Sequence, residues 1–322
     1  FHLFSYLCAI FNYLKMDYLL LVVALGLIVG GAMLLTDGSV ALARRLHIPE
    51  FIVGLTVVAV GTSMPEMAVS MISTVGGYGD MAIGNVVGSN IANALLILGV
   101  CSIFAPVAFT KSNIRRDIPL NIAVSIALLV VAYTSGAIRR VEGILLLMGY
   151  VAMMFYSVRA ERKAMSSEEQ SAQNMSMWRV LLLIVAGLAG LIYGGDIFVE
   201  SATNIAKAWG VSEAVIAITL VAVGTSLPEL AASLASIFKG SPSLALGNVI
   251  GSNIANILLI LGACSSVAPL KMVGVGMVDI CVVVATSVLL LLSALFIGNK
   301  KITRFEGVVF LAIYAAYIYT LL

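Results

Sequence analysis

The sequence GTSMPE at Gly61–Glu66 returns 163 positions later as GTSLPE at Gly224–Glu229. Both copies lie inside long apolar runs, where a proline and an ionisable side chain are each costly. Because proline lacks a backbone N–H and clashes with the carbonyl four residues earlier, each copy predicts a break in a helix. Ser63 and Ser226 precede the glutamates by three residues, the spacing of a capping box that restarts a helix. Broken backbone at membrane depth is tolerated where it lines a wet cavity, so the repeated stretch predicts a functional site.

The composition is that of an integral membrane protein. Of 322 residues, 61% are hydrophobic and 11% are charged, and the mean hydropathy is +1.10. Apolar runs long enough to cross a hydrocarbon core of roughly 30 Å recur along the chain, so the lipid bilayer is the expected environment. The net charge of +2 gives no reason to expect a nucleic-acid partner. There is no nucleophile–His–acid set and no phosphate loop, and the four cysteines lack metal-binding spacing. We therefore expect a transporter rather than an enzyme, buried free cysteines and no organic cofactor.

The apolar pattern predicts an all-α fold with ten membrane spans. They are expected at 17–42, 50–76, 80–105, 118–137, 142–159, 178–206, 212–238, 243–268, 277–298 and 303–321. Residues 1–16 are interpreted as an N-terminal extension and 160–177 as a polar linker that contains the charged stretch after Arg159. The linker separates two halves of five spans each, 17–159 and 178–322.

The two halves are copies of one unit. GNVVGSNIAN at Gly84–Asn93 matches GNVIGSNIAN at Gly247–Asn256, and Pro106 matches Pro269. Because five is an odd number, the second half must enter the membrane in the opposite direction, which predicts an inverted repeat with broken helices at the midplane. Most of the 18 lysines and arginines fall on one side of this threading. The positive-inside rule then predicts a cytoplasmic linker, both termini outside, and location in the inner (plasma) membrane.

Near the middle of the membrane, both halves offer only oxygen ligands. The set comprises glutamates, hydroxyls, carboxamides and the carbonyls ahead of each proline: Glu66, Glu229, Thr62, Ser63, Ser89, Thr225, Ser226, Ser252, Asn85, Asn90, Asn93, Asn248, Asn253, Asn256, Ala59–Thr62 and Ala222–Thr225. Hard oxygens with two carboxylates suit Ca²⁺, which takes about 6–8 oxygen ligands, whereas transition metals favour His or Cys. Two carboxylates that face each other in a low dielectric repel unless cations or protons neutralise them. Competition between ions for such a pair is what an antiporter needs.

The doubled motifs carry a family resemblance. GTSMPE/GTSLPE with GNVVGSNIAN/GNVIGSNIAN resembles the paired alpha-repeats of the sodium/calcium exchanger family, in the cation/calcium exchanger superfamily, over residues 17–322. The resemblance implies a minimal, prokaryotic-type exchanger of ten helices in two inverted repeats. For Ca²⁺ it implies the carboxylates of Glu66 and Glu229 and the carbonyls of Thr62 and Thr225. For Na⁺ it implies Ser63, Ser89, Ser226 and Ser252, with carbonyls at Ala59 and Ala222, and it places a central polar pair at Asn93 and Asn256.

The same resemblance separates the possible coupling ions. Many relatives, and potassium-dependent exchangers in particular, have aspartate at one of the positions that are Asn93 and Asn256 here, which argues against potassium co-transport. Proton/calcium exchangers usually carry a second glutamate where Ser89 and Ser252 stand, which favours sodium over protons. We therefore expect a Na⁺/Ca²⁺ antiporter that works by alternating access, with Ca²⁺ and Na⁺ as transported ions and a monomeric chain. The alternatives are an H⁺/Ca²⁺ (or other cation) antiporter and a passive cation channel.

Two further groups are interpreted through transport. Asp37, Asp196 and Glu200 lie toward the ends of the first and sixth spans, where they are expected to line an aqueous path or to snorkel. The first and sixth spans are also rich in glycine, and alternating-access logic predicts that they slide across the core to switch access. Their glycines are Gly26, Gly30, Gly31, Gly187, Gly190, Gly194 and Gly195.

Overall fold

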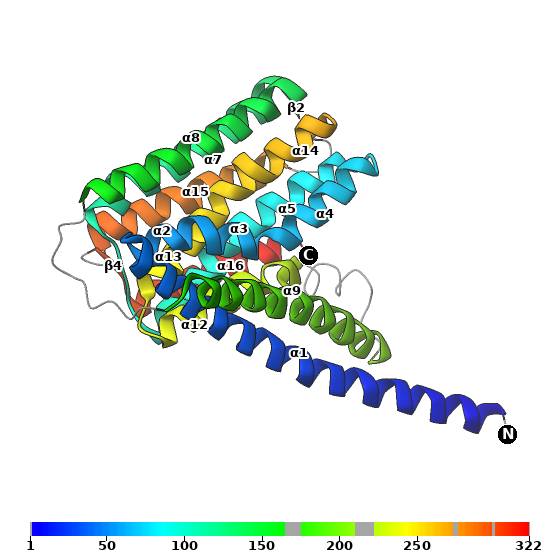
Figure 1. Cartoon of the computed structure of the whole chain (residues 1–322). Helices are drawn as coiled ribbons and strands as arrows, with labels where there is room; N and C mark the ends of the chain where they lie inside the picture. The colour runs from blue at the N-terminus through cyan, green and yellow to red at the C-terminus, as the bar shows by residue number, and fades with distance from the viewer. Residues whose placement is uncertain (1, 165–174, 210–221, 273–275, 298–299, 322) are drawn as a thin grey trace.

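The computed structural model describes residues 2–164, 175–209, 222–272, 276–297 and 300–321, which are almost entirely helical (Figure 1). Within these ranges, eight helical segments are long and apolar enough to cross a membrane: Met16–Leu46, Gly79–Phe104, Asn113–Ser135, Arg140–Arg159, Met177–Ala208, Pro242–Val267, Met277–Phe296 and Arg304–Leu321. A bent pair, Glu50–Thr62 and Met64–Val75, is a ninth candidate. The chain is therefore an all-helical, multi-pass membrane protein. Part of the predicted span 212–238 lies outside the described residues.

The repeated proline motifs break their helices as the sequence predicts. In the first half the chain forms α2 (Glu50–Val53), a π-helical segment η1 (Gly54–Val58), α3 (Ala59–Thr62) and then α4 (Met64–Val75). The axis bends by 46° at Ser63, whose ψ of 11° departs from the helical range. In the second half α11 (Ala222–Thr225) and α12 (Leu227–Phe238) meet in the same way at Ser226, where ψ is 5°. The prolines lie in the first turn after each break, where no N–H is needed.

The helices that carry the second motif change their winding partway along. The first runs as α5 (Gly79–Ile91), η2 (Ala92–Ile97) and α6 (Leu98–Phe104). The other runs as α13 (Pro242–Ala255), η5 (Asn256–Leu261) and α14 (Gly262–Val267). Single π turns inside α-helices are frequent at functional sites, and these two begin at or beside the central asparagines. The hydrophobic pattern alone did not predict them.

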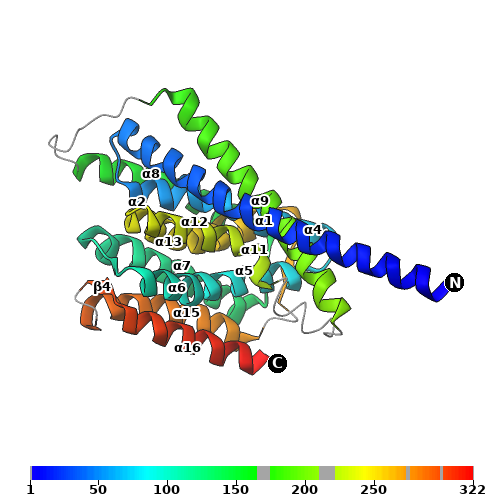
Figure 2. The same cartoon turned by 90° about the horizontal axis from the view of Figure 1, so that it is seen from below.

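The remaining helices form the outer parts of the bundle. They are η3 (Asn113–Asp117) with α7 (Ile118–Ser135), α8 (Arg140–Ala164), α15 (Met277–Leu292) with η6 (Ser293–Ile297), and α16 (Arg304–Leu321). α8 packs against α14, and α16 packs against α6. Figure 2 shows α8 and α16 on opposite sides of the bundle. α13 lies at the centre, and all its residues from Leu244 to Ala255 are buried.

Two short strand pairs tie the halves together. β1 (Val107–Ala108) pairs antiparallel with β4 (Lys301–Ile302), and β2 (Ala137–Ile138) pairs antiparallel with β3 (Leu270–Lys271). The first pair joins Val107 to Ile302, and the second joins Ile138 to Leu270. Because β1 is the repeat equivalent of β3 and β2 is that of β4, the two strand pairs are equivalent to each other under the repeat. Each half thus closes its loops against the other half.

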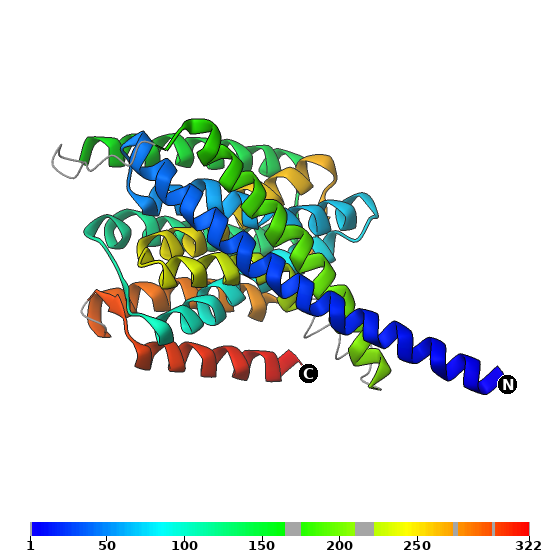
Figure 3. The same cartoon turned by 60° about the horizontal axis from the view of Figure 1, so that its bottom comes forward.

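Helices α1 (His2–Leu46) and α9 (Met177–Ala208) lie side by side across one face of the bundle (Figure 3). Their backbones touch where the predicted glycines meet. A Cβ on Gly31 would lie 2.8 Å from the carbonyl oxygen of Gly187, and a Cβ on Gly187 would lie 2.5 Å from the backbone nitrogen of Leu35. Such small residues let membrane helices approach closely. Glycine is therefore required at this crossing by space rather than by backbone conformation.

Candidate ion-binding site

The breaks bring the two predicted glutamates into the interior of the bundle. Glu66 lies in the first turn of α4 and Glu229 in the first turn of α12, and each is 1% exposed. An ionised group without water around it needs a counter-charge or hydrogen-bond donors. A carboxylate is also favoured at the start of a helix, where backbone N–H groups are free. The two breaks thus place two buried carboxylates in the first turns of helices.

Each glutamate is bonded by the serine of the opposite half. The Ser63 hydroxyl donates to Oε1 of Glu229 at 2.7 Å, and the Ser226 hydroxyl donates to Oε1 of Glu66 at 3.3 Å. Ser63 also lies 3.2 Å from the Ser252 hydroxyl, and Ser226 lies 3.4 Å from that of Ser89. The site is therefore one interlocked cluster built from both halves of the chain.

This arrangement corrects the interpretation of the two serines as helix caps. Neither Ser63 nor Ser226 forms a side-chain capping bond at the start of its helix. A hydrogen bond to an ionised carboxylate is stronger than one to a neutral backbone group, and the opposite glutamate lies within reach of each hydroxyl. Each serine does precede a glutamate by three residues, but its hydroxyl bonds the glutamate of the opposite half and not the backbone of its own helix.

One oxygen of each carboxylate remains without a partner. Among the described residues, Oε2 of Glu66 and Oε2 of Glu229 are buried and accept no hydrogen bond. The same holds for both polar atoms of Asn93, Oδ1 of Asn256 and the hydroxyl of Thr225. Buried polar atoms are costly when unpaired, and a cluster of them indicates a place for a ligand. Five of these six atoms are oxygens, the donor type that Na⁺ and Ca²⁺ prefer.

Asparagines of the second motif fix the backbone beside each glutamate. Asn85 Nδ2 donates to the Glu66 carbonyl at 3.2 Å, and Asn248 Nδ2 donates to the Glu229 carbonyl at 3.3 Å. Asn248 also accepts from the Thr62 hydroxyl through Oδ1 at 3.2 Å. These carboxamides therefore hold the backbone beside each glutamate.

The predicted carbonyl ligands lie at or just before the two breaks. The Ala59 carbonyl accepts the Ser63 N–H at 3.0 Å and also lies 3.5 Å from the Thr62 hydroxyl, so it is already bonded. Thr62 and Thr225 are the last residues before the breaks. Ala222 begins α11, directly after the residues that lie outside the described part.

A cleft of about 770 Å³ reaches the second break. Residues of α4, of α9 and of the α11–α12 turn line it: Met64, Pro65, Met67, Ala68, Val69, Met71, Ile192, Gly195, Asp196, Val199, Glu200, Gly224, Thr225 and Pro228. Asp196 and Glu200 are exposed and contribute carboxylates to its wall. The interpretation that these two acids line a path is therefore consistent with their positions.

Asp37, the repeat equivalent of Glu200, lies in a different environment. Its carboxylate pairs with the Lys239 ammonium at the end of α12, and Lys239 also donates to the Met33 carbonyl at 3.0 Å. Nearby, the Thr36 and Ser236 hydroxyls lie 3.5 Å apart. Thus polar contacts join α1 to α12. At the equivalent place in the other half, a cleft lies between α9 and α4.

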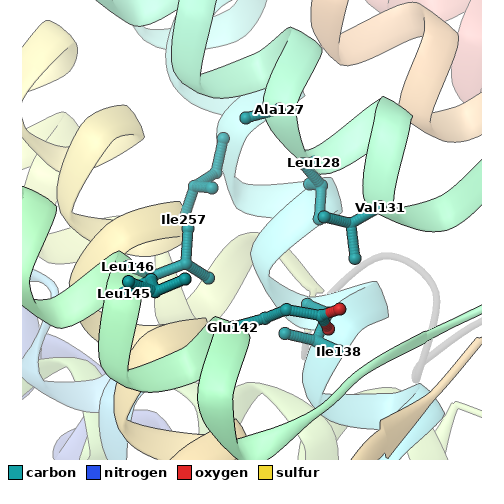
Figure 4. Close-up of a pocket in the computed structure, with 8 residues that line it drawn as sticks. All are labelled: Ala127, Leu128, Val131, Ile138, Glu142, Leu145, Leu146 and Ile257. Atoms are coloured by element: carbon teal, nitrogen blue, oxygen red, sulfur yellow. The ribbon is translucent and has the colours of Figure 1, made fainter. Parts of the chain in front are cut away.

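Other polar and reactive groups lie away from this cluster. Cys101 and Cys264 are buried and free, as predicted, but Cys281 is exposed, so the expectation of burial was wrong there. A separate pocket of about 150 Å³ lies between α7 and α8, next to Ile257 (Figure 4). Its walls are apolar apart from Glu142, whose Oε2 accepts the Arg139 N–H at 2.7 Å. Within the described residues no three His, Cys, Asp or Glu side chains group as a transition-metal site would require.

Taken together, the fold and the site define a membrane transporter with a buried oxygen site that holds two carboxylates. The comparison with known proteins agrees: residues 16–159 and 179–322 match the family model described as "Sodium/calcium exchanger protein". The chain belongs to the sodium/calcium exchanger family.

Individual relatives match over most of their length. The sodium/calcium exchanger MaX1 of Methanosarcina acetivorans is 30% identical, covering 96% of this chain and 99% of that protein. The inner membrane protein YrbG of Escherichia coli (strain K12) is 35% identical, covering 78% of this chain and 79% of that protein. The solved structure of the sodium-calcium exchanger NCX_Mj soaked with zero Na⁺ and Ca²⁺ matches with a TM-score of 0.84 at 33% identity, covering 96% of this chain and 100% of that chain.

Proposed function

We propose that this protein exchanges Na⁺ for Ca²⁺ across the membrane by alternating access. The observation that carries the proposal is the facing pair of buried glutamates, Glu66 and Glu229, each with one carboxylate oxygen that has no partner among the described residues. Two such carboxylates in a low-dielectric interior favour a bound cation and disfavour an empty site. Ca²⁺ and Na⁺ are the transported ions, and either one Ca²⁺ or several Na⁺ neutralises the pair.

The ligands divide by charge and chemistry. Ca²⁺ is assigned to the carboxylates of Glu66 and Glu229, together with the carbonyls of Thr62 and Thr225. Na⁺ is assigned to hydroxyls and carbonyls around them: Ser63, Ser89, Ser226, Ser252, Ala59 and Ala222. Asn93 and Asn256 are assigned as neutral ligands of the same site. Competition for shared carboxylates makes occupation by Ca²⁺ and by Na⁺ mutually exclusive, which couples the two fluxes.

The proposed architecture is ten membrane helices in two inverted halves, 17–159 and 178–322, joined by a cytoplasmic linker at 160–177. The reciprocal strand pairs β1–β4 and β2–β3 support the two-fold relation. We place the protein in the inner membrane with both termini outside, on the distribution of basic residues and on similarity to a protein named for the inner membrane.

Access to the site is proposed to alternate between two equivalent routes. The cleft beside α9 reaches Thr225, whereas the equivalent face beside α1 is fastened by Lys239. Sliding of α1 and α9 over the core, with the two helices held together at their glycine crossing, would exchange the two arrangements. Only neutralised sites would make the exchange, because moving two bare carboxylates through the interior is costly.

The deciding experiment is uptake of ⁴⁵Ca²⁺ into proteoliposomes loaded with Na⁺, compared with K⁺-loaded and pH-jumped vesicles. Uptake only with an outward Na⁺ gradient is expected. Uptake driven by the pH jump without Na⁺ would instead identify an H⁺/Ca²⁺ antiporter that uses the same glutamates. Flux that follows the Ca²⁺ gradient without any counter-ion would identify a channel.

A further inference from the structure

A cluster of four asparagines occupies the crossing of the two second-motif helices. Asn90 of α5 and Asn93 of η2 come from the first half, and Asn253 of α13 and Asn256 of η5 come from the second. All four are between 0% and 2% exposed. Asn93 and Asn256 belong to the site already described, whereas Asn90 and Asn253 have no assigned role. Each half contributes the same two asparagines, but the hydrogen bonds that the two halves form are different.

The orientation of the Asn90 carboxamide is fixed by backbone. Its Nδ2 donates to the carbonyl of Asn253 at 3.2 Å. A carbonyl can only accept, so the amide nitrogen of Asn90 must face it and Oδ1 must face the other way. That oxygen accepts from Nδ2 of Asn256 at 3.0 Å.

This second bond in turn fixes Asn256. Since Asn90 presents an oxygen, Asn256 must present its nitrogen there, and its own Oδ1 is left without a partner among the described residues. Asn256 lies four residues after Ser252 and so shares a helical face with the hydroxyl that contacts Ser63. Asn93, the repeat equivalent, has no hydrogen bond to either polar atom among the described residues. The Oδ1 atom of Asn253 likewise has no partner there.

We propose that Asn90 is a positioning residue that locks Asn256 with its carbonyl oxygen available to a cation, while Asn93 stays unlocked. The inference rests on the proposed function, because it assumes that Asn256 contacts a transported ion. It adds that the two central asparagines are unequal: one is a preset oxygen ligand, and the other is free to turn. Asn253 supplies only its backbone, so its side chain is dispensable for this arrangement.

The first test compares two matched deletions, Asn90→Ala and Asn253→Ala, in the reconstituted full chain. The readout is the Na⁺ concentration that half-inhibits ⁴⁵Ca²⁺ uptake, divided by the Ca²⁺ concentration that half-saturates it. We expect Asn90→Ala to change this ratio by about fivefold, the effect of one lost hydrogen bond, and Asn253→Ala to leave it within about twofold. Equal effects of the two deletions would overturn the proposal.

A double-mutant cycle shows whether Asn90 acts through Asn256. In an Asn256→Ala background, adding Asn90→Ala is expected to leave the ratio unchanged, because the side chain to be positioned is already gone. A further change of the same size as in the wild-type background would mean that Asn90 acts by another route. Absence of Na⁺-dependent uptake by the wild-type protein would instead contradict the proposed function itself.

A gain-of-function test avoids dependence on a damaged fold. Asn256→Asp places an acceptor opposite the fixed oxygen of Asn90, so Asn90 must turn and lose its bond to the Asn253 carbonyl. Serine at position 90 can donate to either acceptor. We therefore expect Asn256→Asp alone to lower ⁴⁵Ca²⁺ uptake by about fivefold. Adding Asn90→Ser is expected to restore this uptake, and adding Asn253→Ser is not. Equal recovery with both serines, or with neither, would contradict the proposed lock.

Discussion

The glutamates of the site are held by side chains from the other half of the chain. Ser63 bonds Glu229 at 2.7 Å, and Ser226 bonds Glu66 at 3.3 Å. Each serine leaves one carboxylate oxygen without a partner among the described residues. The hydroxyls therefore orient the carboxylates and leave one oxygen of each available to a cation. A site that must bind and release cations requires this.

The variants Glu66→Gln and Glu229→Gln test whether the charges of these two carboxylates bind the cation. Each is expected to lower Na⁺-driven Ca²⁺ uptake by roughly 100-fold or more, because removing one partner of a buried charged contact costs about 3–5 kcal/mol. Glu142→Gln is the control, since Glu142 lies in the separate pocket between α7 and α8. Intact uptake in both site variants would show that the site has been placed wrongly.

The helices around the site are joined by contacts of two kinds. α1 and α9 meet backbone to backbone at Gly31 and Gly187. α1 and α12 are joined instead by polar groups, with Lys239 bonded to Asp37 and to the Met33 carbonyl. The close glycine crossing keeps α1 and α9 together, whereas the polar tie must break before α1 and α12 separate.

Gly31→Ala and Gly187→Ala are predicted to impair the protein through packing. A Cβ at either position would lie within 2.8 Å of backbone atoms of the other helix, and overpacking of this kind costs about 1–3 kcal/mol. We expect the melting temperature in detergent to fall by roughly 2–6 °C and the exchange rate to fall with it. Gly30→Ala, at a glycine with no atom within 4 Å of its Cβ position, is the control. Alanine favours a helix over glycine, so an equal loss in Gly30→Ala would mean that crowding at the crossing is not the cause.

The contacts of Lys239 that join α12 to α1 give a second prediction about the helices. Lys239→Ala is expected to raise the labelling rate of a Thr36→Cys variant by up to about fivefold, since a partly exposed ion pair contributes about 1 kcal/mol or less. Thr36 is 1% exposed and lies against Ser236 behind the tie. The measurement is maleimide labelling in a background without the four native cysteines, with Lys111→Ala as the control. Unchanged labelling would show that Lys239 does not hold this face closed.

The molecule as a whole is a single bundle whose halves cannot form the site separately. Strand pairs join the halves at β1–β4 and β2–β3, and the hydrogen bonds of both glutamates cross between the halves. Burying unpaired oxygens opposes folding, so the folded state gains stability when a cation supplies the missing contacts. Ion binding and global stability are therefore linked.

This linkage predicts that Ca²⁺ stabilises the protein against heat. At a Ca²⁺ concentration 100 times the dissociation constant, the gain is about 2.7 kcal/mol, which corresponds to a rise in melting temperature of roughly 4 °C or more. Removal of Ca²⁺ with a chelator, in buffer free of Na⁺, should reverse it. The Glu66→Gln/Glu229→Gln double variant should show no Ca²⁺-dependent rise, and a rise of the same size there would locate the stabilising ion elsewhere.

Much of the fold could be predicted from the sequence, because its signals are local. A run of apolar residues sets a span, proline sets a break, and the repeated motifs set the pairing of the breaks at Ser63 and Ser226. The π segments η2 and η5 were not predictable, because a one-residue change in winding depends on what packs against the helix. The capping-box interpretation of Ser63 was wrong for the same reason: the competing acceptor, Glu229, is 166 residues away.

The sequence by itself determined that this is a membrane protein, that its two halves carry repeated motifs, and that these motifs offer oxygen ligands together with Glu66 and Glu229. Only the tertiary structure decided which contacts each copy makes. Lys239 closes one face while a cleft opens at the other, and Asn90 fixes Asn256 although nothing described fixes Asn93. The motifs that carry the asparagines are near-identical and encode near-identical local preferences, so the asymmetry of Asn90 and Asn93 arises from contacts between the halves. The tie differs for another reason, since the repeat equivalent of Lys239 is Gly76.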